Sequence, residues 1–245
     1  MDPNNLILTL RSLRMGGMAE ALEQQIASPS YLDMSFEDRL SALLENEVSQ
    51  RKNRKIKRIM TKSNMRHEAA PETIDYGASR GLDKSVISSL LNCHWVESGQ
   101  HNLILTGLTG TGKTWLACAF GCAAARKQLT VGYHRVGPLL EDLDTARHDG
   151  ERSKMLGQIR KLDLLILDDL GLDQLTHNNI IDLLNVLDDR VGRRSTIVAA
   201  QMPVKDWHQY LGGGAEADAI MDRIVNSSRQ IKLTGESLRA KNKPE

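Results

Sequence analysis

The chain has 245 residues, a length typical of one large domain or of one domain with a smaller appendage. Hydrophobic residues make up 40% and charged residues 26%, as in ordinary globular proteins, and the formal net charge of +1 excludes a globally basic nucleic-acid binder. No run approaches about 18 apolar residues and the first twenty lack a secretory pattern, so we expect no membrane segment and no leader. Three cysteines without metal-type spacing favour a cytoplasmic location.

The first part of the chain predicts helices. Apolar residues recur at helical spacing over residues 4–27, with a bend at Gly16-Gly17, and Ser35 with Asp38 has the pattern of a capping box that begins a second helix. The later part of that helix is very basic, because residues 51–66 contain eight Lys and Arg and no acid. We therefore expect a small all-helical N-terminal domain over residues 1–66.

After a connector over residues 67–84, the pattern changes to alternating helices and strands. A short helix is predicted near 85–95, and short apolar strands alternate with helical segments over the rest of the chain. This alternation predicts an α/β domain over 67–245, with a parallel sheet covered by helices on both faces. The five predicted strands are residues 102–106, 130–134, 162–167, 195–200 and 229–233.

The strongest motif is GLTGTGKT at residues 107–114, which fits G-x-x-x-x-G-K-[ST] between a predicted strand and a predicted helix. Glycines in such a loop let backbone N–H groups surround phosphates, and the helix N-terminus adds a favourable dipole. We expect Lys113 to reach the β- and γ-phosphates and Thr114 to bind Mg²⁺. The predicted ATP-binding residues are Gly107, Thr109, Gly110, Thr111, Gly112, Lys113 and Thr114.

A second motif is the apolar run LLIL followed by Asp168 and Asp169. A buried strand that ends in acids delivers carboxylates to the carboxyl edge of the sheet, beside the P-loop. We expect Asp168 to hold Mg²⁺, directly or through water, and Asp169 to polarise the attacking water.

With both motifs placed, nearly the whole chain resembles AAA+ ATPases of the DnaC/DnaA-like initiator and helicase-loader branch, and more closely the IstB transposition helpers. The resemblance rests on a basic helical N-terminus followed by GLTGTGKTWLACAFGCAA, LLILDDLG, TIVAAQMPVKDWH and AIMDRIVNSSRQIKLTGESLR. It implies an AAA+ core with a five-stranded parallel sheet. It also implies an ATP-dependent DNA-binding regulator that oligomerises on duplex DNA and recruits a partner transposase.

The resemblance implies three further catalytic positions. Gln201 matches the sensor 1 position, where many AAA+ proteins have Asn or Thr, and Arg223 matches the arginine finger that reaches a neighbouring subunit's γ-phosphate. Arg239 matches a second sensor. Because the sequence ends six residues later, we expect little or no helical lid and an active site shared between subunits.

Two groups of basic residues are candidate contacts to DNA phosphates. The first group is Arg51, Lys52, Arg54, Lys55, Lys57, Arg58, Lys62 and Arg66, which alternatively form a solvated helix face. The second group, from the segment between the second and third strands, is Arg135, Arg147, Arg152 and Lys154, and a solvated amphipathic helix is an equal alternative there.

Charge is therefore distributed unevenly along the chain. Residues 1–50 carry a net −5, residues 51–66 carry +8 and residues 67–245 carry −2. Two other functions remain open at this point. A replicative helicase loader has the same ATPase core, and a small-molecule P-loop kinase has the same loop but needs an acceptor pocket and an Arg-bearing lid.

Overall fold

The computed structural model describes residues 2–31 and 33–238. The chain divides into two compact units, one ending at Arg58 and the other beginning at Ile59. This division falls inside one long helix. The first unit contains α1 (Pro3–Ser12), α2 (Gly16–Ala27), the short η1 (Pro29–Tyr31) and most of α3 (Phe36–Lys62).

The start of α2 is held by a carboxylate from α3. Glu47 is only 4% exposed, and its Oε2 accepts hydrogen bonds from the backbone N–H groups of Gly17 (2.7 Å) and Met18 (3.2 Å). The first N–H groups of a helix have no partner within the helix, so an acid placed there stabilises the helix end. A side chain at Gly17 would meet the Glu47 backbone at 2.7 Å, so the close crossing of α2 and α3 requires glycine.

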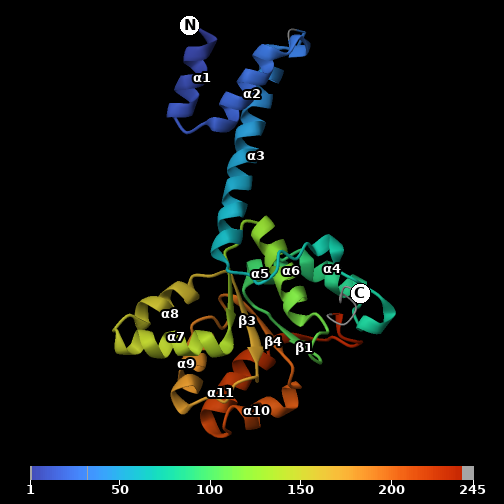
Figure 1. The fold of residues 1–245 in the computed structure, drawn as a ribbon, viewed down its shortest axis with the longest axis vertical. Coiled ribbons are helices and arrows are strands. Elements are labelled where there is room, and N and C mark those ends of the chain that lie inside the picture. Colours follow the sequence, from blue (N-terminus) through green and yellow to red (C-terminus); the bar gives the residue numbers. More distant parts are fainter. Residues whose placement is uncertain (1, 32, 239–245) are drawn as a thin grey trace, which may run out of the picture. The chain divides into compact units, whose positions relative to one another are not determined.

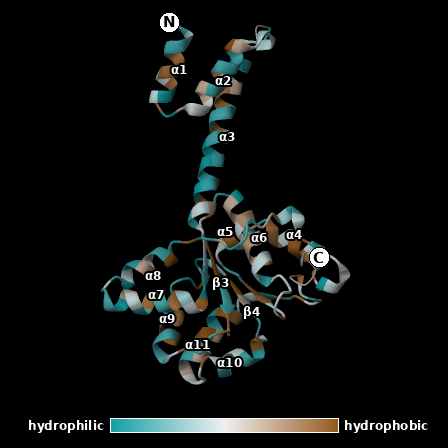
Figure 2. Cartoon of the chain, in the orientation of Figure 1, coloured by the Kyte–Doolittle hydropathy of each residue, from teal (hydrophilic) through white to brown (hydrophobic). Residues whose placement is uncertain are grey.

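The predicted capping residues begin α3. Ser35 Oγ accepts a hydrogen bond from the backbone N–H of Asp38 at 3.1 Å, and the Ser35 hydroxyl donates to the Asp38 carboxylate at 2.7 Å. Beyond its first turns α3 is mostly hydrophilic, as Figure 2 shows. Within the described residues, no helix is both long enough and apolar enough to cross a lipid bilayer.

The second unit is an α/β assembly that follows the predicted alternation. Its first helices are η2 (Pro71–Thr73), η3 (Ala78–Arg80), α4 (Lys84–Leu91) and α5 (His94–Ser98). The strands are β1 (Asn102–Thr106), β2 (Val131–Arg135), β3 (Leu164–Leu170), β4 (Ser195–Ala200) and β5 (Ser228–Lys232). The connecting helices are α6 (Lys113–Arg126), α7 (Val136–His148), α8 (Arg152–Arg160), α9 (His177–Asp188), η4 (Val204–Asp206), α10 (Trp207–Tyr210) and α11 (Gly214–Val225).

The five strands form one parallel sheet in the order β2-β3-β4-β1-β5, between helices on its two faces (Figure 1). Successive side chains of a strand point to opposite faces, so each central strand contributes to two hydrophobic cores. Leu103 and Leu105 pack with α6 in one core, whereas Ile104 packs with α7, α9 and α11 in the other. The α/β fold with a five-stranded parallel sheet is as predicted.

Two predicted elements differ from the structure. The single helix expected near residues 85–95 is two helices, because Cys93 adopts a left-handed backbone conformation (φ 58°) between α4 and α5. The third strand, expected to end at Leu167, continues through both acids to Leu170. A local irregularity in the pairing of β3 with β4, between Leu167 and Leu170, explains this extension.

Candidate functional site

The P-loop connects the end of β1 to the start of α6. Gly107, Gly110 and Gly112 have φ values of 151°, 82° and 90°, in the region that glycine adopts without strain from a Cβ atom. Lys113 is 8% exposed, and its Nζ donates hydrogen bonds to the carbonyl oxygens of Gly107 (2.8 Å) and Leu108 (2.9 Å). The lysine side chain therefore lies back along its own loop.

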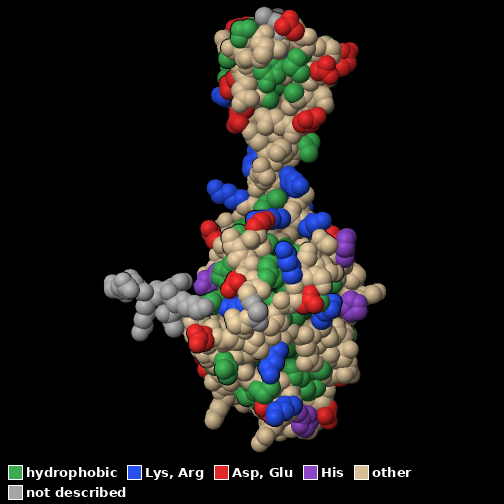
Figure 3. All heavy atoms as spheres, turned by 90° about the vertical axis from the view of Figure 1, so that its right-hand side faces the viewer, with side chains coloured by type: hydrophobic (Ala, Val, Ile, Leu, Met, Phe, Trp, Pro, Cys, Tyr) green, Lys and Arg blue, Asp and Glu red, His purple; other side chains and the backbone are tan. Residues whose placement is uncertain are grey.

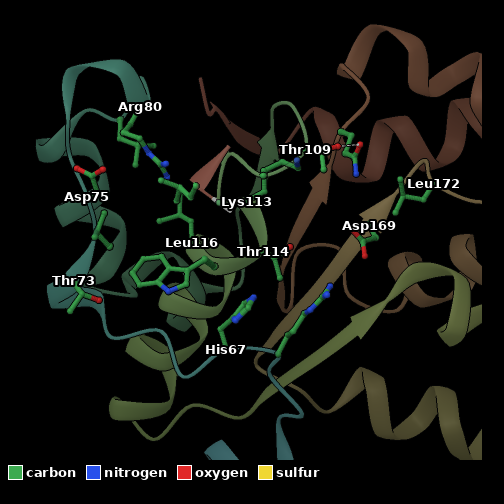
Figure 4. Close-up of a pocket in the computed structure, with 18 residues that line it drawn as sticks. His67, Thr73, Asp75, Arg80, Thr109, Lys113, Thr114, Leu116, Asp169 and Leu172 are labelled. Carbon is green, nitrogen blue, oxygen red and sulfur yellow. Dashed lines mark hydrogen bonds between the residues drawn. The ribbon is translucent and has the colours of Figure 1, made fainter. Parts of the chain in front are cut away.

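A cavity of about 720 Å³ opens beside this loop. Thr109, Gly110, Gly112, Lys113 and Thr114 line it, whereas Gly107 and Thr111 shape the loop without lining the cavity. Figure 4 shows Thr73, Asp75 and Arg80 on one side of the loop, with Asp169 and Leu172 on the other. The cavity is large enough for a nucleotide, since ligand pockets commonly measure roughly 300–1,000 Å³.

Asp168 and Asp169 lie in a β-bulge of β3. Pairing with β4 runs regularly to Leu167 opposite Val198 and resumes with Leu170 opposite Ala200, so the two acids oppose one residue. Asp169 has a left-handed φ of 62°, which is uncommon for a residue other than glycine and which clusters at functional sites. The bulge gives the two carboxylates different surroundings, because Asp169 lines the cavity and Asp168 is 1% exposed behind it.

Each acid has a partner from β2. The Tyr133 hydroxyl donates to Asp168 Oδ2 at 2.7 Å, and Arg135 Nε donates to Asp169 Oδ2 at 3.0 Å. Burial, together with the hydrogen bond to Asp168, raises the pKa of Tyr133 far above its ordinary value, so the hydroxyl stays protonated and remains a donor. The backbone N–H of Asp169 donates to Asp168 Oδ1 at 3.0 Å, so both oxygens of that buried carboxylate are engaged.

Gln201 lies directly after β4 and lines the cavity. Its Oε1 accepts a hydrogen bond from the Thr109 hydroxyl at 2.7 Å, which joins the end of β4 to the P-loop. The structure therefore brings together five sequence-predicted groups: the loop backbone, Lys113, Thr114, Asp169 and Gln201.

Arg223 lies apart from this cavity. It is on α11, where its Nε donates to Asp188 of α9 at 2.7 Å and its Nη1 donates to the Ala219 carbonyl at 3.0 Å. Its side chain is 28% exposed and does not line the cavity of its own chain. The other predicted sensor, Arg239, lies outside the described residues.

The predicted basic contacts on α3 are exposed, and Figure 3 shows Lys and Arg side chains gathered over this stretch. Arg51 pairs with Glu47 at 2.6 Å and Arg54 approaches the same carboxylate at 3.6 Å. Arg66 differs from the others, because it follows α3 and lines the cavity beside the P-loop. The remaining basic side chains of this group are Lys52, Lys55, Lys57, Arg58 and Lys62, all exposed.

The second predicted DNA group is engaged within the protein. Arg147 and Arg152 each donate to Asp182 at 2.6 Å, and this carboxylate has no exposed surface. Arg135 pairs with Asp169, and Lys154 pairs with Glu151 at 2.7 Å. The buried carboxylate of Asp182 holds Arg147 and Arg152 in one geometry, whereas Arg135 and Lys154 pair with acids that keep exposed surface, so a DNA contact remains a prediction for this group.

The residues at the cavity fit a magnesium nucleotide. Mg²⁺ is commonly held by one or two protein oxygens together with phosphate oxygens and water, and the Thr114 hydroxyl with the acids of β3 forms such a set. Among the described residues, no cluster of three or more His, Cys, Asp or Glu side chains suits a metal on its own. A metal at this site would therefore depend on phosphate oxygens of the nucleotide.

Sequence reasoning missed the residues that surround the predicted ones. Tyr133 carried no motif and Arg135 was predicted only as a DNA contact, because the sequence does not show that their strand lies beside Leu164–Leu170. Arg80 lies in the connector, where the periodicity is lost, and it lines the cavity while 7% exposed. No pattern in the sequence distinguishes this arginine from a surface one.

The strand order, the P-loop and the bulged acidic strand together define the chain as an AAA+ protein. Residues 8–245 match the family described as IstB-like ATP binding protein, and the chain belongs to this family. An insertion sequence ATP-binding protein of Sinorhizobium fredii is 41% identical over 94% of each chain. The ATP-binding protein of insertion sequence IS1162 from Pseudomonas fluorescens is 43% identical, over 83% of this chain and 88% of the relative.

Solved structures share the fold. The DnaC helicase loader superposes with a TM-score of 0.58 at 18% identity, over 68% of this chain and 97% of the loader. The replication initiator DnaA bound to AMPPCP and single-stranded DNA superposes with a TM-score of 0.57 at 18% identity, over 71% of this chain and 52% of DnaA. These likenesses confirm the predicted AAA+ fold, and the predicted family is also confirmed.

Proposed function

We propose that this protein is an Mg²⁺-dependent ATPase that assembles on duplex DNA and presents it to a partner transposase. One observation carries the proposal: a family-matched P-loop opens onto a nucleotide-sized cavity that also receives Asp169 and Gln201. Lys113 and the loop N–H groups would bind the β- and γ-phosphates. Thr114 and Asp168 would hold Mg²⁺, with Asp168 acting through water because it lies behind the cavity wall.

Asp169 is the proposed group that polarises the attacking water, since its carboxylate is the acid of β3 that lines the cavity. Gln201 would orient that water or a γ-phosphate oxygen. Bound magnesium would neutralise phosphate charge in this reaction. Arg135 donates to Oδ2 of Asp169 at 3.0 Å, so the other carboxylate oxygen, Oδ1, is the proposed acceptor of the proton from water.

Arg223 is the proposed arginine finger, acting on a neighbouring copy. Its position away from its own cavity supports a role between subunits, and its pairing with Asp188 keeps the guanidinium oriented at the protein surface. We propose Arg239 as a second sensor. An active site completed by a neighbour makes hydrolysis depend on assembly.

Contacts to DNA phosphates are proposed for the exposed basic residues of α3. Side chains of this kind bind the phosphate backbone without reading sequence, and the binding weakens as salt rises. The relatives are named for the insertion sequences that encode them, which supports a transposase as the partner. The free thiols of all three cysteines suit the reducing cytoplasm, where we place the protein. The proposed DNA contacts are Arg51, Lys52, Arg54, Lys55, Lys57, Arg58 and Lys62.

Sizing by analytical ultracentrifugation tests the proposal, with a non-hydrolysable ATP analogue and duplex DNA present or absent. We expect large assemblies only when both are present. Lys113→Ala should remain unassembled, because it loses the phosphate contact. Arg223→Ala should assemble but hydrolyse ATP poorly, whereas Asp222→Asn on the same helix should behave as the unaltered protein.

A monomer under every condition would contradict the assembly, and normal hydrolysis by Arg223→Ala would contradict the finger. The same measurement tests the alternative function, that of a helicase loader. The chain shares its fold with the DnaC helicase loader. A loader need not bind duplex tightly, so assembly on single-stranded DNA in preference to duplex would favour that alternative.

A further inference from the structure

The chain that follows α3 brings an arginine to the nucleotide cavity. Two residues after the helix ends, Asn64 turns the backbone with a left-handed φ of 53°, a conformation that asparagine tolerates at helix ends. Arg66 comes two residues later and lines the cavity together with Thr114. Figure 4 shows His67, the next residue along, with its side chain toward the same cavity.

The guanidinium of Arg66 carries a charge that no acid of the protein compensates. Its side chain is exposed, and no carboxylate in the described part of the chain forms an ion pair with it. The two other cations that line the cavity donate to P-loop carbonyl oxygens, Lys113 to that of Gly107 and Arg80 to that of Thr111. Arg66 is therefore available to an anion that enters the cavity.

Packing against α6 places Arg66 near the phosphate end of the site. Thr114, Cys118 and Gly121 share one face of α6, because residues three and four apart are neighbours on a helix. A Cβ atom at Gly121 would lie 2.5 Å from the Met65 sulfur, so the chain after α3 crosses this face closely. Burial raises the pKa of Cys118 to about 11, and the backbone N–H of Arg66, which lies close to the sulfur, acts in the opposite direction.

A second contact fixes the same segment beside the acidic strand. The Ser63 carbonyl accepts a hydrogen bond from the Tyr133 backbone N–H at 2.8 Å, and Ser63 is only 1% exposed. The hydroxyl of the same tyrosine donates to Asp168. Arg66 lies three residues after this anchor, so its backbone is held between the strand that carries a partner of Asp168 and the helix that carries Thr114.

We propose that the Arg66 guanidinium binds the terminal phosphates of ATP in the cavity of its own chain. The proposal rests on the proposed function in taking this cavity to be the ATP site. A guanidinium binds two phosphate oxygens at once, which a lysine does not, and this geometry suits a cation that must reach a polyphosphate from the cavity wall. Lys62, the last of the proposed DNA contacts, lies four residues before Arg66, so neighbouring parts of one segment would bind the phosphates of ATP and of DNA.

Isothermal titration of ATP with Mg²⁺ into the full chain, without DNA, tests the proposal. Charge-assisted hydrogen bonds to one side chain commonly change affinity by about 10- to 100-fold, so Arg66→Gln should weaken ATP binding within that range. Arg66→Lys keeps the charge but not the paired donors, and its affinity should lie between the two. Arg160→Gln is the matched control, because Arg160 is an exposed arginine of α8 that does not line the cavity, and it should bind ATP normally.

Thermal melting without nucleotide provides the readout that a structural role would move. The Arg66 side chain is exposed and has no acidic partner, so Arg66→Gln should melt at the Tm of the unaltered protein. A clear fall in its Tm, or ATP affinity equal to that of the unaltered protein, would overturn the proposal. Failure of the unaltered protein to bind ATP would overturn the ATP site itself, a result distinct from these.

DNA offers the same phosphate chemistry, so a second measurement separates the two sources of phosphate. Anisotropy of labelled duplex across a salt series is recorded with an ATP analogue at a concentration that saturates each variant. Lys62→Gln should reduce the slope of log K against log salt by about 0.9, the loss expected for one phosphate contact, whereas Arg66→Gln should leave the slope unchanged. An equal reduction by Arg66→Gln would assign Arg66 to DNA and contradict the proposal.

Discussion

Asp168 and Asp169 show how neighbouring residues of one type acquire different surroundings. Asp168 is buried with both oxygens hydrogen-bonded, by the Tyr133 hydroxyl and by the Asp169 backbone, whereas Asp169 faces the cavity and pairs with Arg135. The positions of both acids and of the P-loop could be predicted, because their motifs are local in sequence. Their partners could not, because Tyr133 and Arg135 lie 35 and 34 residues away and meet the acids only through strand pairing.

Tyr133→Phe should slow ATP hydrolysis while sparing metal-free ATP binding. The hydroxyl orients the carboxylate proposed to position magnesium, and losing such an outer contact commonly costs roughly 10- to 100-fold in activity or metal affinity. We expect kcat to fall within that range and the Kd for ATP in EDTA to change less than about twofold, as the phosphate contacts remain.

Tyr210→Phe is the matched control for this prediction. The Tyr210 hydroxyl also donates a hydrogen bond, to the Asp173 carbonyl at 2.7 Å, but neither residue lines the cavity. It should therefore retain full activity. A Tyr133→Phe protein with unchanged kcat and unchanged magnesium dependence would show that the Tyr133 hydroxyl is not required to orient the Asp168 carboxylate.

At the scale of elements, periodicity predicted most strands and helices but not their interruptions. β1 and β4 have the predicted bounds, and each contains a short buried apolar run, Leu103–Leu105 in β1 and Ile197–Ala200 in β4. β3 was predicted too short, because a bulge lets a strand include polar residues that alternation excludes. The break between α4 and α5 depends on one backbone angle at Cys93, which no side-chain pattern encodes.

The ion pairs between helices could not be predicted from the sequence either. Asp182 on α9 receives Arg147 from α7 and Arg152 from α8, so one fully buried carboxylate joins three helices. In the sequence the two arginines were indistinguishable from solvated or DNA-binding residues. Only the packing of the helices shows that their shared partner is an acid with no access to water.

Asp182→Asn should lower the free energy of unfolding by about 3 kcal/mol, since breaking a buried ion pair leaves charge uncompensated. Urea denaturation followed by circular dichroism measures this loss. Asp144→Asn is the control, because Asp144 also faces Arg147 but at 3.6 Å and half exposed, so it should change stability by less than about 0.5 kcal/mol. Equal effects of the two substitutions would contradict a stabilising role for the ion pairs of Asp182 with Arg147 and Arg152.

At the scale of the whole molecule, net charge is a poor guide and its distribution a good one. The formal +1 combines a net −5 over residues 1–50, +8 over residues 51–66 and −2 over residues 67–245. Most of that positive charge is exposed on α3, whereas the basic residues between β2 and α8 pair with acids. Among the described residues, electrostatic attraction to DNA phosphates is therefore expected mainly from the basic side chains of α3.

Changing Lys52, Lys55 and Arg58 to Glu should weaken salt-sensitive binding to duplex DNA strongly and leave ATP binding unchanged. Each lost phosphate contact should also reduce the slope of log K against log salt by about 0.9. Fluorescence anisotropy of labelled duplex across a salt series measures both quantities. The same change in charge at Lys127, Lys205 and Lys232, which are exposed on the second unit, should have little effect. Equal losses in both triple variants would show that net charge, not the α3 segment, determines binding.

The bulge in β3 separates the chemistry of the strand from its packing. Leu165, Leu167 and Leu170 all lie in the core beneath α7 and α9, so the side chain of Leu170 occupies the place that strict alternation would give to residue 169. Asp169 is therefore an extra residue in the alternation of inward and outward side chains along β3. Replacing Asp169 with Asn, which also tolerates a left-handed backbone conformation, is therefore expected to leave the hydrophobic core intact.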